Sequence, residues 1–201
     1  MNTQMIFVRI ATINDGRYID EIIKETEASA IARGTGISKR TYESIFQKMR
    51  DGKAVIAVTS AGDWVGFAYF EVWEEGKFVS NSGLIVSPEY RKSGVARSIK
   101  DRLFKLSRRL YPMAKIFSIT SGAAVMKMNS LIGFQPVTFG EITHDIKFWE
   151  GCKSCPNFNI LQQKKQVNCL CTAMLFDPEA CVNHSILPTQ DLIQRYATRT
   201  H

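Results

Sequence analysis

The chain has 201 residues, of which 45% are hydrophobic and 22% charged, and a formal net charge of +7. This length and balance are typical of one globular domain with a sizeable core. No apolar run reaches the ~18–20 residues that span a bilayer, and the N-terminus has no basic region followed by a long apolar stretch, as a secretory signal would. We therefore expect a cytoplasmic protein without a membrane partner.

The positive charge indicates anionic partners. The basic residues are scattered, however, so we expect no nucleic-acid partner. A polyanionic cofactor with an acidic substrate would account for the charge. One helix carries basic residues that we interpret as its solvated polar face. These are Arg97, Lys100, Arg102, Lys105, Arg108 and Arg109.

The predicted elements follow one another in an order typical of a mixed sheet. Alternating or continuous apolar residues between turn signals predict strands over 7–10, 54–59, 64–73, 77–86, 115–119, 136–138 and 168–176. Helical spacing predicts helices around 19–23, over 39–49 after a Ser38 cap, over 95–110 and over 123–131. The order β-α-α-β-β-β-α-β-α-β-β predicts an α/β protein with a mixed sheet and helices on both faces.

The most informative stretch is 84–96. A short apolar strand ends at Ser87-Pro88, a basic turn containing Gly94 follows, and a helix opens at Val95. The first amides of a helix have no intrahelical acceptor and carry partial positive charge, so this arrangement can bind an anion. Gly94 lets a ligand approach the backbone closely. A P-loop would need Gly-Lys-Ser/Thr here, and a Rossmann fingerprint three glycines.

The pattern Arg91-x-x-Gly94-x-Ala96 after a strand resembles the coenzyme A pyrophosphate loop of the GNAT N-acetyltransferases. The resemblance implies the GNAT fold over residues 1–176, with a mixed, mostly antiparallel sheet flanked by helices. It implies acetyl-CoA or another acyl-CoA as co-substrate, with its pyrophosphate on the loop amides and its pantetheine on the preceding strand. The residues expected to bind it are Leu84, Ile85, Val86, Arg91, Lys92, Ser93, Gly94, Val95, Ala96 and Arg97.

Further segments resemble the acetyltransferase domain of N-acetylglutamate synthases, in a stand-alone form without the kinase domain. They are 8–15, 38–40, 86–91, 119–121 and 133–134. This resemblance implies transfer of an acetyl or other short acyl group to the α-amine of an amino acid, glutamate first, in arginine biosynthesis. The alternatives are transfer to another small amine or a protein lysine, a non-catalytic coenzyme A-binding module, and a basic nucleic-acid-binding protein.

Aminolysis of a thioester needs a donor for the tetrahedral oxyanion, and a backbone N–H of Ile85 or Val86 is expected to supply it. The acceptor ammonium must lose a proton, and Glu71 is the candidate base, with Glu74 and His144 as alternatives. A surface carboxylate or a loop histidine is the simpler interpretation of each.

Many GNAT enzymes have a Tyr general acid four residues before a Gly-Phe pair, and Asn129 stands at that place. An amide can donate a hydrogen bond but cannot protonate a thiolate as a phenol can. The N-acetylglutamate synthases also tend to lack this Tyr. The other interpretation of Asn129 is a polar residue on the exposed side of its helix.

An acidic acceptor needs cations for its carboxylates. Arg33, Lys39 and Arg40 flank the glycine-containing break between the first two helices, which borders the acceptor pocket in the GNAT fold. Thr120, in the matched segment 119–121, is expected to bind the acceptor with them. Solvation on the helix surface is the alternative interpretation of the cations.

The five cysteines are an odd number, which in an unexported chain indicates free thiols or a metal. Cys152-x-x-Cys155 and Cys169-x-Cys171 lie within 150–171, which we interpret as an insertion. Residues two apart on a strand share a face, so these four thiols could hold a structural zinc; the alternative is small buried apolar residues. The fifth, Cys181, lies in a tail over 177–201, where one short helix is expected. An assembly of identical subunits is compatible with the sequence.

Overall fold

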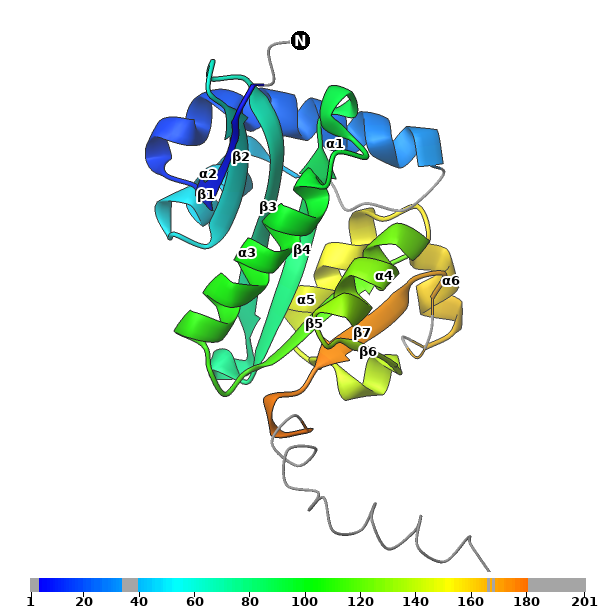
Figure 1. Ribbon diagram of the computed structural model, residues 1–201. Coiled ribbons are helices and arrows are strands. Elements are labelled where there is room, and N and C mark those ends of the chain that lie inside the picture. The colour runs from blue at the N-terminus through cyan, green and yellow to red at the C-terminus, as the bar shows by residue number, and fades with distance from the viewer. Residues whose placement is uncertain (1–3, 34–39, 166, 168, 181–201) are drawn as a thin grey trace, which may run out of the picture.

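The computed structural model describes residues 4–33, 40–165, 167 and 169–180. A seven-stranded sheet in the order β1-β2-β3-β4-β5-β7-β6 runs through the molecule (Figure 1). Neighbouring strands are antiparallel except β4 and β5, which are parallel. The strands are β1 (Ile6–Ile10), β2 (Ala54–Thr59), β3 (Trp64–Trp73), β4 (Phe78–Val86), β5 (Lys115–Thr120), β6 (Gln135–Val137) and β7 (Thr172–Phe176).

Helices cover both faces of this sheet (Figure 1). On one face α1 (Ile19–Arg33) and α2 (Tyr42–Arg50) pack against β2 and β3. On the other face α3 (Val95–Leu110) packs along β2, β3 and β4, followed by α4 (Ala123–Leu131). The short helices α5 (Ile146–Glu150) and α6 (Phe158–Gln163) join an aromatic cluster against β5 and β7. Among the described residues, no helix is long and apolar enough to cross a membrane.

The side chains of β3 alternate between these two faces. Ala68 and Phe70 belong to the core under α3, whereas Phe67 and Tyr69 belong to the core under α1 and α2. This is the two-residue period of a strand that is buried on both sides. The same alternation directs Glu71 toward the face that α2 covers.

The predicted order of elements is confirmed as far as β6, and β2, β3 and α4 have the predicted bounds. The sequence did not predict α5 and α6, because their five and six residues are too few to show a helical period. β7 begins at Thr172 and not at 168, so Cys169 and Cys171 precede the strand. Thr41 caps α2 by accepting a hydrogen bond from the Ser44 amide; the expected cap, Ser38, lies outside the described residues.

The prediction that the basic side chains of α3 all lie on a solvated face is wrong for Lys100, which is only 3% exposed. Lys100 follows the buried Ile99 by one residue and precedes the buried Leu103 by three. Lys100 therefore lies at the border of the apolar stripe of α3. At such a position, sequence spacing alone does not tell whether a side chain is exposed or buried.

β4 and β5 pair only over Phe78–Ser80 and Lys115–Phe117. β4 continues to Val86 and β5 to Thr120, so the two strands diverge beyond their last pair. The sheet therefore has a gap in the middle, where the backbone groups of β4 and β5 do not form hydrogen bonds with each other.

A bulge in β4 lies beside this gap. Phe67 pairs with Ile85 and Tyr69 pairs with Ser82, so two residues of β4 stand opposite one residue of β3. One of them is Gly83, with φ +67°, where an added Cβ would lie 2.4 Å from the Tyr69 ring. Glycine is thus needed here both for its backbone conformation and for the close approach of the ring.

Candidate active site

A cavity of about 430 Å³ opens where β4 and β5 diverge. Lys100 and Leu103 line it from one face of the sheet, and we call this the α3 side. Arg40, Glu71 and Trp73 line it from the other face, which we call the α2 side. The cavity thus passes through the sheet. A second cavity of about 400 Å³ lies between α3 and α4 and shares Lys100 with the first.

The loop before α3 has the geometry of an anion site. Gly94 caps the helix with φ +87°, and an added Cβ would meet nothing within 4 Å. The first helical amide with a main-chain acceptor is that of Arg97, 3.1 Å from the Gly94 oxygen. The amides of Val95 and Ala96 therefore have no main-chain acceptor among the described residues, and a ligand can reach them.

The other loop side chains shape this turn. The Ser93 hydroxyl donates to the Tyr90 carbonyl at 2.6 Å. Lys92 is exposed and has a positive φ of 63°.

Arg91 and Arg97 point to different places. The Arg91 Nε donates to the Val86 carbonyl at 3.2 Å, and its Nη2 donates to Ser29 at 2.9 Å and forms an ion pair with Glu25. Arg91 therefore fastens the loop to β4 and α1. Arg97, in the first turn of α3, lines the second cavity, whereas Arg91 and Lys92 do not.

The β4 backbone presents one of its two candidate amides to the gap. Ser87 N–H donates to Val65 at 2.9 Å, and Val86 stands opposite Gly66. In an antiparallel pair the bonding direction alternates from residue to residue, so the Ile85 amide points toward β3 and the Val86 amide points away from it. The Val86 carbonyl, which accepts from Arg91, has the same orientation.

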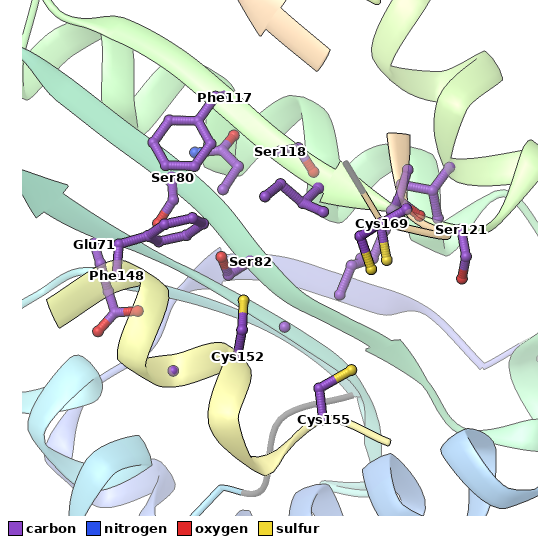
Figure 2. A pocket seen from close by; sticks show the side chains of 18 of the residues that line it. Glu71, Ser80, Ser82, Phe117, Ser118, Ser121, Phe148, Cys152, Cys155 and Cys169 are labelled. Carbon is purple, nitrogen blue, oxygen red and sulfur yellow. The ribbon is translucent and has the colours of Figure 1, made fainter. Parts of the chain in front are cut away.

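Glu71 lies on the α2 side of the cavity (Figure 2). Its Oε1 accepts from the Lys48 ammonium of α2 at 2.6 Å, while Oε2 has no hydrogen bond with the described residues. Across the strands it faces Ser80, whose hydroxyl accepts from the Trp73 indole at 2.9 Å. The carboxylate is thus held at one oxygen and open at the other.

The alternative bases Glu74 and His144 lie outside the residues that line the cavity. The Glu74 carboxylate accepts from the Thr143 hydroxyl and the His144 amide, each at 2.7 Å. The bond from Thr143 lowers the pKa of Glu74 below its usual value. Glu74 therefore fastens the segment after β6, and it is a weaker base than an ordinary glutamate.

Two cations line the α2 side. The Arg40 guanidinium lies over the Tyr69 ring, 5.6 Å from its centroid. Lys147, from α5, is the second. Burial raises the pKa of Tyr69 to about 12, so its hydroxyl stays protonated and adds no negative charge beside Arg40.

Of the other three predicted acceptor residues, Thr120 lines the cavity. It lies at the end of β5, and its hydroxyl oxygen accepts from the Gly122 amide at 3.1 Å. Arg33 is the last residue of α1. Lys39 lies outside the described residues.

Asn129 is fully buried, which overturns its interpretation as a residue on the exposed side of α4. Its Nδ2 lies 3.5 Å from the Met174 sulfur, and its Oδ1 has no hydrogen-bond partner among the described residues. A buried amide oxygen that accepts no hydrogen bond destabilises the folded state. Asn129 is therefore a poor choice for packing alone.

The zinc prediction is not supported. Among the described residues, which include Cys152, Cys155, Cys169 and Cys171, no group of three or more Cys, His, Asp or Glu side chains could hold a metal ion. Because Cys169 and Cys171 precede β7, they do not share a strand face as the prediction required. The thiols instead line the cavity wall, with Cys152 and Cys155 projecting from one side and Cys169 from the other (Figure 2).

The pKa values of two of these thiols are raised. Burial, with the neighbouring thiols, raises the pKa of Cys152 to about 11 and that of Cys171 to about 12. Cys152 and Cys169 also pack against the aromatic cluster of α5 and α6. These properties are those of small, protonated, partly buried residues.

The sequence patterns missed several residues of the site. Lys100 was assigned to solvent, and Asn81 and Lys147 carried no pattern at all. An aromatic wall on the α2 side was also missed. It consists of Trp73, Phe117, Phe139, Phe148 and Phe158. The only signal for the wall was the density of aromatic residues over 139–158, which is equally typical of a core.

No protein-family model matches the chain, and no curated protein matches it. Solved structures match it in fold. N-acetylglutamate synthase from Neisseria gonorrhoeae, complexed with coenzyme A and N-acetyl-glutamate, matches with a TM-score of 0.61 at 14% identity over 86% of this chain and 35% of that one. Rv2747 from Mycobacterium tuberculosis, in complex with coenzyme A, matches with a TM-score of 0.61 at 18% identity over 85% of this chain and 98% of that one.

A GNAT superfamily phosphinothricin acetyltransferase from Sinorhizobium meliloti, in complex with AcCoA, matches with a TM-score of 0.58 at 15% identity, over 86% of this chain and 88% of that one. The chain thus spans about a third of the N-acetylglutamate synthase and most of the other two proteins. At these identities the matches establish the fold. The predicted GNAT fold is confirmed.

Proposed function

We propose that the protein is an acyl-CoA-dependent N-acyltransferase. The observation that carries the proposal is the cavity through the sheet, which joins Lys100 and Leu103 of the α3 side to the cations and the carboxylate of the α2 side. An acyl-CoA would enter from the α3 side and an amine from the α2 side. The two would meet in the gap between β4 and β5.

The loop residues fit coenzyme A. Open space at Gly94 and the free amides after it suit a pyrophosphate, and Arg97 supplies a nearby positive charge. The diverging edges of β4 and β5 offer main-chain groups to the amides of a pantetheine. The polar and basic lining of this side would otherwise have no purpose.

The chemistry is direct transfer without an acyl-enzyme. Glu71, through its open oxygen or a bound water, accepts the proton that the acceptor ammonium must lose. The amine then attacks the thioester carbonyl, and the Val86 amide, which points into the gap, donates to the oxyanion. Collapse of the tetrahedral intermediate forms the new amide and releases the coenzyme A thiolate.

The acceptor we propose is an amino acid with a carboxylate side chain, glutamate first, in arginine biosynthesis. Arg40 and Lys147, which line the cavity, would bind its two carboxylates, with Thr120 at the β5 edge. We keep Arg33 and Lys39 as further acceptor residues. The complex of N-acetylglutamate synthase with N-acetyl-glutamate, in the same fold, supports this acceptor. The donor is acetyl-CoA or another short acyl-CoA.

Thiol release from acetyl-CoA and succinyl-CoA, measured against a panel of amino acids, tests the proposal. Glutamate-dependent release is the expected result. Release that depends only on other amines would move the assignment to a different acceptor. Coenzyme A binding without release on any amine would favour a non-catalytic binding module. Asn129, which replaces a phenol by an amide, is the observation that favours this second candidate.

A further inference from the structure

The ammonium of Lys100 is the most unusual charge in the described part of the molecule. The residue is 3% exposed, and it lines both the cavity through the sheet and the cavity between α3 and α4. Among the described residues, its one cation–π or hydrogen-bonding contact is with the Phe134 ring, whose centroid lies 5.2 Å from Nζ. A buried ammonium without a hydrogen-bonded partner destabilises a fold, so the position indicates a ligand.

Neighbouring buried groups also lack partners. Asn81 lines the cavity on β4, one residue beyond the last pair with β5, and its Nδ2 donates to Ser107 of α3 at 2.9 Å. Its Oδ1 has no hydrogen bond among the described residues, and neither has the Oδ1 of Asn129. In the described part of the chain, the α3 side of the gap thus presents one unpartnered donor, the Lys100 ammonium, and one unpartnered acceptor, the Asn81 Oδ1, to whatever enters it.

The groups of the site are divided between the faces of the sheet. Glu71 lies on the α2 side, the Val86 amide lies in the gap, and Lys100 lies on the α3 side. In the proposed reaction the amine arrives from the α2 side, so the sulfur of the acyl-CoA lies toward α3. Asn129, at the place of the usual phenol, directs its Nδ2 to the Met174 sulfur and has no acidic proton.

We propose that Lys100 is the general acid that protonates the departing coenzyme A thiolate. This inference rests on the proposed function. When the tetrahedral intermediate collapses, the carbon–sulfur bond breaks and its electron pair goes to sulfur. A proton moves from Nζ to that sulfur, and the resulting neutral amine takes a proton from solvent before the next turnover. The acceptor nitrogen loses two protons, one before it attacks and one as the amide forms, and both leave separately through Glu71 and solvent.

The acidity of Lys100 suits this role. Burial alone lowers the pKa of Lys100 to about 7, and no charged side chain contributes to that shift. An ammonium of this acidity transfers its proton to a thiolate far more readily than an ordinary lysine, whose pKa is about 10.4.

The test uses Lys100→Met, which keeps the length and the apolar bulk of the side chain. With acetyl-CoA and glutamate we expect kcat to fall about 100-fold or more, a typical loss for a general acid, with the KM for acetyl-CoA changed about threefold or less. Lys100→Arg should not restore kcat, because a guanidinium does not give up its proton. Lys105→Met, on the exposed side of the same helix, is the matched control and should leave both constants unchanged.

A second measurement does not depend on turnover. The ultraviolet thiolate band of coenzyme A bound to the protein reports the pKa of its thiol. An adjacent ammonium lowers the pKa of the thiol. The pH at which half of the bound thiol is ionised should therefore rise by about one unit in Lys100→Met and stay unchanged in Lys105→Met. Circular dichroism confirms that each variant is folded.

Each outcome decides the question. A raised KM with unchanged kcat would make Lys100 a binding charge only and would overturn the proposal, as would stable acylation of Lys100 seen by mass spectrometry. Absence of thiol release by the native protein would refute the proposed function and the acid role together. If the pH midpoint of the thiolate band still changed in Lys100→Met, the ammonium would lie at the sulfur even so. If that midpoint did not change, the contact between Lys100 and the sulfur would be refuted.

Discussion

The α3 side and the α2 side of the gap are built from different parts of the chain. On the α3 side, the main-chain amides after Gly94 and the helix that follows form the site within a single continuous segment. The α2 side is formed by residues that are far apart in the sequence. Arg40 precedes α2, Glu71 lies on β3 and Lys147 lies on α5. A site made of backbone in one segment leaves a motif, whereas a site made of converging side chains does not.

The largest expected effect is on stability and belongs to the α3 side. The pKa of Lys100 is about 7 in the folded chain, against 10.5 as its ordinary value. Between these values the unfolded chain binds more protons, so the stability of the native protein rises with pH there. Below about pH 7 both states are protonated and the cost of burying the charge is complete.

Lys100→Met should therefore raise the free energy of unfolding by about 3 kcal/mol near pH 6. The gain should shrink as pH rises and vanish near the ordinary pKa of 10.5. Urea unfolding at several pH values measures it. A gain that does not depend on pH would mean that folding does not shift the pKa of Lys100, and this would remove the main electrostatic difference between the two sides.

The next effect concerns the loop. Gly94→Val places a branched side chain at φ +87° in the open space assigned to the pyrophosphate, and coenzyme A affinity should fall about 100-fold. Gly62→Val is the matched control, since Gly62 has φ +94° and equally open surroundings in the turn before β3. Thermal unfolding should show an equal loss of stability in both variants, and calorimetric titration should show a loss of affinity only at Gly94. Retained affinity would refute the loop assignment.

A smaller effect is expected on the α2 side. Arg40→Ala should raise the KM for glutamate about tenfold and leave the KM for acetyl-CoA nearly unchanged, because Arg40 lies on the α2 side of the sheet. Arg50→Ala, at the exposed end of α2, is the control. If both Michaelis constants rose together, the division of the cavity into two sides would be wrong.

The smallest effect is expected at Arg91. Its guanidinium contacts Val86, Ser29 and Glu25 and so does not face the second cavity. Arg91→Ala should weaken coenzyme A binding only about threefold, through a looser loop, whereas Arg97→Ala should weaken it more. Titration of both variants at low and moderate salt gives the comparison; a reversed order would assign the pyrophosphate to Arg91.

Sequence reasoning succeeded where a single segment carries its own signal. The bounds of β2, β3 and α4 and the loop at Gly94 follow from turn residues and spacing within the segment. It failed where residues distant in the sequence determine the environment of a side chain. Lys100 faces the interior cavity that opens where β4 and β5 diverge, and Glu74 lies outside that cavity, where it binds Thr143 and His144.

The cysteines show the same limit. Their spacing was compatible with zinc only if residues 168–171 were part of a strand, and β7 begins at Thr172. Nothing local marks that boundary, because the residues before it are compatible with either conformation. Asn129 was misplaced for a similar reason. A polar residue in a short helix was expected to face water, whereas it faces Met174 of β7.

The brief pairing of β4 with β5 has a consequence for how specificity can change. On the α3 face one continuous core joins both halves of the sheet, whereas on the opposite face the core under α1 and α2 is separate from the aromatic cluster of α5 and α6. We therefore expect that the part of the aromatic wall contributed by Phe139, Phe148 and Phe158 can change without disturbing the loop at Gly94. A chimera carrying a foreign segment there should acquire a new amine preference while inheriting the donor of its host.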